Sequence, residues 1–172
     1  LNDLLLQDLS DRQNNLPYRF GYSFDVDINF FDLATLDLLP NGDRVYRLEI
    51  NSKDAYSINF IFNKFNLLDH TELFIYNKSK NSIIGAFTSH NNKSYNRFST
   101  APVSGDSVII EYYQPHNIES ESIINISNII NGYKNVFRGY DDSEDCNNNV
   151  NCAEFQSWND EISSVVLTLT DG

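Results

Sequence analysis

The stretch Tyr18–Phe30 (YRFGYSFDVDINF) alternates between apolar and polar side chains. One set of alternate positions is apolar or aromatic: Phe20, Tyr22, Phe24, Val26, Ile28 and Phe30. The positions between them include Arg19, Ser23, Asp25, Asp27 and Asn29. Because successive side chains of a strand point to opposite faces, this period predicts a strand of an antiparallel sheet. One face of that sheet is buried and the other meets water.

Further segments with the composition or alternation of strands follow at short intervals. They are Arg44–Ile50, Ala55–Phe65, Glu72–Asn77, Ser82–Thr88, Arg97–Thr100, Ser107–Tyr113 and Ser122–Ile130. Twelve Phe and ten Tyr residues, with no Met, also favour strands over helices. Many short strands joined by turns predict an all-β fold, and we expect an antiparallel, jelly-roll-like β-sandwich.

Only one segment before the first strand has a helical pattern. Asn2–Asn14 places Leu5, Leu6 and Leu9 on one face, and the Leu16-Pro17 step ends the helix. The turn Pro40–Asp43 (PNGD) combines a proline, which fixes one φ, with an Asn-Gly pair that accepts positive φ. The sequence therefore predicts a short N-terminal helix attached to the sandwich.

The polar stretch Asn131–Asn149 marks a boundary between two parts of the chain. We expect residues 1–137 to form the sandwich, and residues 138–172 to form a linker and the first strand of a second domain. The apolar segment Glu161–Thr170 is that additional C-terminal strand. A strand without its own sheet needs a free sheet edge, in the same chain or in another, to pair with.

A net charge of −12 limits the partners of the chain. A surface this acidic is repelled by phosphate backbones and anionic membranes, so nucleic acid is not an expected partner. No apolar run reaches the roughly 20 residues that a membrane span needs. The leucines Leu4–Leu6 are too few, and their flanks too acidic, for a signal peptide.

No residue pattern predicts a catalytic or metal site. The histidines His70, His90 and His116 fall in separate predicted loops, without the spacing of a zinc site or a catalytic base. Asp25 and Asp27 share a strand face, as alternation alone requires. The acidic segment 141–149 lacks the spacing of an EF-hand. We therefore predict no catalytic residue, no metal ligand and no cofactor.

Two cysteines, Cys146 and Cys152, lie in an Asn-rich loop shortly before the single Trp, Trp158. They can bond to each other, if their Cα atoms lie within about 7 Å, or each can bond to a separate partner. The spacing alone leaves both pairings open.

Several motifs in this order resemble one family. They are LPYRFG (Leu16–Gly21), LPNGDRVYRLEI (Leu39–Ile50), LFIYN (Leu73–Asn77), IIGAFT (Ile83–Thr88), NNK (Asn91–Lys93), PVSGDSVIIEYYQP (Pro102–Pro115), INGYKNVF (Ile130–Phe137) and CNNNVNC…WNDEISSVV (Cys146–Val166). The chain looks like the N-terminal part of a bacterial secreted lysyl-endopeptidase-like protein. Such proteins are trypsin-like serine endopeptidases made as precursors with a β-rich pro-region.

The resemblance implies a role and a location. Residues 1–137 would be a pro-domain that assists folding of its own downstream protease domain and blocks the active site until proteolytic removal. The catalytic residues would lie beyond Gly172, and Cys146 and Cys152 would bond to cysteines farther along. The protein would be secreted or at the bacterial cell surface. Lys134 and Arg138 are the basic residues between the domains, so we expect processing within Lys134–Asp141.

Two other interpretations remain open at this point. A secreted jelly-roll module can bind glycan or peptide through exposed aromatic residues, here Tyr95, Tyr112, Tyr113 and Tyr140. A complete small enzyme is the other, although nothing in the chain resembles a nucleophile and its base.

Overall fold

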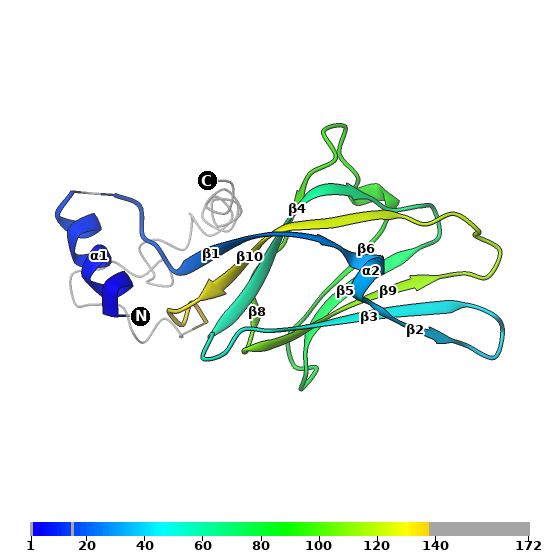
Figure 1. The fold of residues 1–172 in the computed structure, drawn as a ribbon, viewed down its shortest axis with the longest axis horizontal. Helices are drawn as coiled ribbons and strands as arrows, with labels where there is room; N and C mark the ends of the chain where they lie inside the picture. The colour runs from blue at the N-terminus through cyan, green and yellow to red at the C-terminus, as the bar shows by residue number, and fades with distance from the viewer. Residues whose placement is uncertain (1, 15, 138–172) are drawn as a thin grey trace, which may run out of the picture. The chain divides into compact units, whose positions relative to one another are not determined.

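The computed structural model describes residues 2–14 and 16–137 (Figure 1). Its elements are α1 (Asn2–Gln13), β1 (Gly21–Asn29), α2 (Phe30–Leu33), β2 (Thr35–Leu38), β3 (Arg44–Asn51), β4 (Ser57–Asn66), β5 (Glu72–Asn77), β6 (Ile83–Phe87), the 3-10 helix η1 (Ser89–Asn91), β7 (Phe98–Ser99), β8 (Val103–Ser104), β9 (Ser107–Gln114) and β10 (Ile123–Gly132). The strands predicted from alternation are all present, with small shifts at their ends.

The strands form two antiparallel sheets. The first has the order β1-β10-β4-β7, with β8 also paired to β4, and the second has the order β2-β3-β9-β5-β6. The chain crosses repeatedly between the sheets, which lie face to face in Figure 1. The prediction of an all-β antiparallel sandwich with a short N-terminal helix is therefore confirmed.

The core is a cluster of large apolar side chains contributed by both sheets. Its largest fully buried members are Tyr112, Phe30, Phe60, Phe62, Phe65, Ile58, Leu67, Leu73, Ile75, Ile110, Ile124 and Ile126. Phe62 is at the centre of an aromatic group, with ring centroids 5.4 Å from Phe65 and 6.2 Å from both Phe60 and Phe98. This group joins β4 to its neighbour β7 within one sheet, and Leu73, Ile75 and Ile110 from the other sheet complete the buried cluster.

The apolar face of β1 is not buried along its whole length. Phe30, just after the strand, is fully buried, and Val26 and Ile28 pack against the core. Tyr22 and Phe24, at the start of the strand, are exposed and contact each other, with ring centroids 4.9 Å apart. The period correctly predicts the shared face, but the opposite sheet does not cover its first part.

The strand β2 has no alternation in its burial, and the sequence pattern does not predict it. All four of its residues are exposed, and it is held at the sheet edge by pairing with β3. The turn between them is the predicted Pro40–Asp43 turn, in which the amide of Gly42 donates to the carbonyl of Leu39 (2.9 Å). Gly42 has a φ of 87°, which accounts for a glycine at this position.

The chain divides into two units, Leu1–Val136 and Phe137–Gly172. All of the described strands belong to the first unit. The predicted C-terminal strand, Arg138 and both cysteines lie outside the described residues.

Candidate functional site where helix α1 meets the end of strand β10

The helix α1 contacts the sandwich through a polar face. Asp8 is buried, and Leu4 and Asp11 are partly buried. These positions are three or four residues apart, so they lie on one side of a helix. The attachment of α1 therefore depends on two carboxylates as well as on a leucine.

Asp8 joins the helix to the residues that follow β10. Its Oδ1 accepts a hydrogen bond of 2.8 Å from the hydroxyl of Tyr133, and its Oδ2 lies 2.7 Å from the Nζ of Lys134. The ammonium of Lys134 also lies over the Tyr18 ring, 4.4 Å from its centroid. The Lys134 side chain is only 19% exposed as a result. We call Asp8, Tyr18, Tyr133 and Lys134 the α1 clamp.

A second ionic contact supports the same helix one turn farther on. The guanidinium of Arg19 donates to Oδ2 of Asp11 and to Oε1 of Gln7, at 2.7 Å in each case. Charged hydrogen bonds of this kind are about twice as strong as neutral ones. Arg19, before β1, and Lys134, after β10, thus both hold the inward face of the helix.

The α1 clamp shifts the pKa values of its acidic members. Burial opposes ionisation of Asp8, but hydrogen bonds from Lys134 and Tyr133, with the positive charges of Lys134 and Arg19, outweigh it and lower the pKa. Burial and the neighbouring Asp8 carboxylate raise the pKa of Tyr133 to about 12. Asp8 is therefore an anion and Tyr133 a neutral donor at pH 7.

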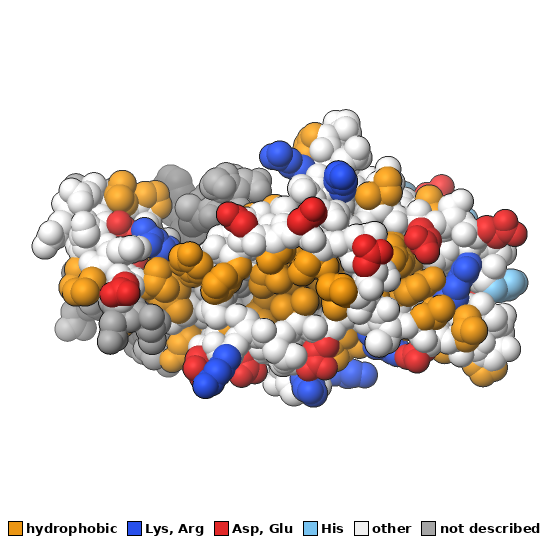
Figure 2. Space-filling view, in the orientation of Figure 1, with side chains coloured by type: hydrophobic (Ala, Val, Ile, Leu, Met, Phe, Trp, Pro, Cys, Tyr) orange, Lys and Arg blue, Asp and Glu red, His pale blue; other side chains and the backbone are white. Residues whose placement is uncertain are grey.

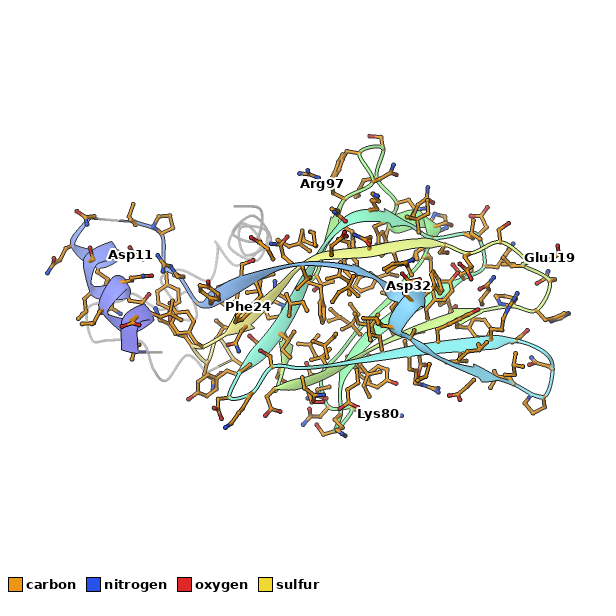
Figure 3. The ribbon with its side chains drawn as sticks, viewed as in Figure 1. Asp11, Phe24, Asp32, Lys80, Arg97 and Glu119 are labelled. Atoms are coloured by element: carbon orange, nitrogen blue, oxygen red, sulfur yellow. The ribbon has the colours of Figure 1, made fainter. Side chains whose placement is uncertain are left out.

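Because the face with Leu4, Asp8 and Asp11 is turned inward, the other three leucines of α1 are turned outward. Leu5, Leu6 and Leu9 are 46%, 66% and 58% exposed. We call these three side chains the leucine stripe. In Figure 2, further apolar side chains form a band along the side of the sandwich on which β1 lies. Figure 3 labels Phe24 on β1 and Asp11 on α1, which lie toward the same end of the sandwich.

A second buried carboxylate lies in a different polar cluster, at the turn between β2 and β3. Asp43 accepts hydrogen bonds from the hydroxyl of Tyr113 (2.6 Å), the backbone amide of His116 (2.8 Å) and the side chain of Asn41 (2.6 Å). The Nδ1 of His116 lies 3.0 Å from the same carboxylate. The hydrogen bond from Tyr113, together with those from His116, holds the pKa of Asp43 well below its usual value.

The cluster around Asp43 stabilises a turn. Its donors close the turn after β2 onto the loop after β9. His70 has a positive φ in a turn, and His90 lies in η1. The three histidines thus belong to three different segments between strands.

The two aspartates of β1, Asp25 and Asp27, accept hydrogen bonds from different residues of β10. Asp25 accepts a hydrogen bond of 2.7 Å from Asn128, whereas Asp27 accepts one of 2.8 Å from Asn125. An irregularity in the β1–β10 register falls between Asp25 and Ile28. Each carboxylate thus serves cross-strand pairing on the polar face of the sheet.

The aromatic residues suggested for glycan or peptide binding do not share one surface. Tyr112 is fully buried in the core, and its neighbour Tyr113 points to the other face of β9, where it binds Asp43. Tyr95 is exposed in the loop before β7, and Tyr140 lies outside the described residues.

Sequence reasoning identified Lys134 but missed Asp8, its partner. The two residues belong to segments at opposite ends of the described chain, and nothing local in either segment indicates the contact. A carboxylate in the middle of a leucine-rich helix was the available signal, since such a residue needs a partner when it is buried.

Among the described residues, no group of three or more His, Cys, Asp or Glu side chains is placed to hold a metal ion. No helix within this part of the chain is long and apolar enough to cross a membrane. Comparisons with protein-family models, with curated proteins and with solved structures returned no match to this chain.

Proposed function

We propose that residues 1–137 are the pro-domain of a secreted serine endopeptidase precursor. In this role the sandwich assists the folding of the domain that follows it and covers the active site until it is removed. The endopeptidase class comes from the motif resemblance. The docking role rests on the exposure and position of the leucine stripe.

The observation that carries the docking role is the inverted orientation of α1. Leaving three leucines about half exposed on a short helix forgoes part of the free energy of their full burial, which is about 1.5–3 kcal/mol for a whole leucine side chain. A sandwich that acted alone would gain stability by turning these leucines inward. Exposed apolar groups of this kind mark surfaces that bind another part of a protein.

The position of the leucine stripe indicates what covers it. Lys134 contacts Asp8 in the same helix, so the chain leaves the sandwich beside α1. The proposed downstream domain follows Lys134 in the sequence. A domain tethered to this residue would meet the stripe at a high effective concentration.

A pro-domain is useful when a protease folds slowly. Chymotrypsin-like barrels depend on long-range β pairing, which carries a large entropic cost before the contacts form. A sandwich that is already folded supplies an apolar surface and free sheet edges against which these strands can order. The same contacts cover the cleft of the folded enzyme until cleavage separates the two parts.

The test is a refolding experiment on the precursor, read from residue 1 through Gly172 and onward in its reading frame. We expect active peptidase, measured with a peptide substrate containing Lys or Arg at the scissile bond. Replacing Leu5, Leu6 and Leu9 together by Ser is expected to lower the recovered activity about tenfold or more, because the docking surface is lost. The matched control replaces Leu36 and Leu38, which are exposed on β2, and should leave the yield unchanged.

Two results would overturn the proposal. One is a precursor that refolds equally well with the leucine stripe replaced or with residues 1–137 deleted. The other is a reading frame that contains no peptidase domain after Gly172. In the second case the binding-module alternative would be tested next, by calorimetry with glycans and peptides.

A further inference from the structure

We propose that the α1 clamp protects Lys134 from trypsin-class proteases. This protection rests on the contacts of Asp8, Tyr18, Tyr133 and Lys134 alone.

The side chain of Lys134 is held by three groups. Its ammonium is bound to Asp8 at 2.7 Å, lies over the Tyr18 ring at 4.4 Å and lies 5.3 Å from the centroid of Tyr133. A trypsin-class enzyme must take the whole lysine side chain into its specificity pocket. Lys134 can enter such a pocket only after all of these contacts have been broken.

The backbone of Lys134 is paired as well. The amide of Lys134 donates to the carbonyl of Phe20 (3.2 Å), which extends the pairing between β1 and β10 beyond Gly132. A protease binds its substrate as an extended strand that is free to pair with the enzyme. Cleavage after Lys134 therefore requires the end of β10 to separate from the residues before β1, as well as the release of α1.

The test is limited proteolysis of the whole 172-residue chain with a lysine-specific endoprotease, followed by mass spectrometry of the fragment ends. In the unmodified chain we expect the bond after Lys134 to resist cleavage. The exposed Lys80 and Lys93 measure the activity of the protease and the intactness of the fold in the same sample. Figure 3 shows Lys80 and the loop bearing Arg97 well apart from α1.

In the variant Asp8→Asn we expect cleavage after Lys134 to become about tenfold faster or more, because proteolysis follows the population of the open form. The matched control is Asp3→Asn, which removes an exposed carboxylate from the first turn of the same helix and should leave Lys134 protected. Equal cleavage after Lys134 in the unmodified chain and in Asp8→Asn would overturn the proposed protection.

A second variant keeps the proposal testable if Asp8→Asn also accelerates cleavage at Lys80 and Lys93. Tyr18→Ala retains the carboxylate and removes the ring above the ammonium, and we expect about threefold faster cleavage after Lys134. Cleavage unchanged in this variant as well would contradict the clamp.

The assay uses an added protease, so its failure is distinct from failure of the pro-domain proposal, which depends on refolding of the precursor.

Discussion

The core of the sandwich and the attachment of helix α1 are stabilised in opposite ways. Phe62 and its aromatic neighbours bury large apolar surfaces between two sheets, with no charge in the group. The helix instead buries Asp8 against Lys134 and Tyr133 and leaves the leucine stripe exposed. Apolar burial resists changes of pH and salt, whereas a charged contact depends on both. The core should therefore keep its stability when pH or salt changes, whereas the attachment of α1 should depend on both.

The largest effect we expect comes from the core. Phe62→Ala should lower the free energy of unfolding by about 3–5 kcal/mol, because a fully buried aromatic side chain leaves a cavity. Chemical denaturation followed by near-UV circular dichroism measures this loss. The control Leu38→Ala, at a side chain that is 70% exposed, should change stability by no more than about 0.5 kcal/mol. Comparable losses in the two variants would show that this core does not dominate stability.

An intermediate effect on the attachment of α1 is expected from alkaline pH. Tyr133 has its pKa raised from 10.0 to about 12 in the folded protein, so its contribution is complete below pH 10 and is lost as the pH rises through about 12. Deprotonation would place a phenolate beside the Asp8 carboxylate. Two-dimensional carbon–proton NMR of the leucine methyl groups of α1, whose protons do not exchange with water, should therefore show the helix detaching between these values.

At acid pH the attachment of α1 should also weaken, because Asp8 then loses its charge. The pKa of Asp8 is lowered below its usual 3.8, so its contribution is complete above that value and is lost as the pH falls through the depressed pKa. Arg19 and Lys134 would then face a neutral carboxyl. The control Tyr133→Phe should remove the alkaline step attributed to Tyr133 and keep the acid one. An unchanged alkaline step in this variant would contradict the assignment.

The smallest effect is expected from an exposed ion pair. Lys78 and Glu49 lie 3.1 Å apart with side chains that are 70% and 40% exposed. Such exposed pairs contribute little to stability, and salt screens them. Lys78→Ala should therefore leave the denaturation midpoint nearly unchanged, in low and in moderate salt. A loss as large as that of a core substitution would show that exposure is a poor guide to the strength of ionic contacts here.

The sequence predicted most of the fold because the strands carry their own information. Alternation along β1 and β9 and the turn chemistry around Gly42 are local properties, and the structure agrees with them. Local patterns could not predict β2, whose residues are all exposed and which exists through its pairing with β3. They also could not show that Tyr22 and Phe24 lie beyond the part of the face that the second sheet covers.

The candidate site was predictable only in part. The sequence identified Lys134 as a basic residue at the boundary and placed Leu5, Leu6 and Leu9 on one face of a helix. Which face of α1 would be buried was decided by Asp8, through contacts with Tyr133 and Lys134 from the other end of the described chain. Helical periodicity fixes which side chains share a face, but only the groups supplied by distant segments decide which face turns inward.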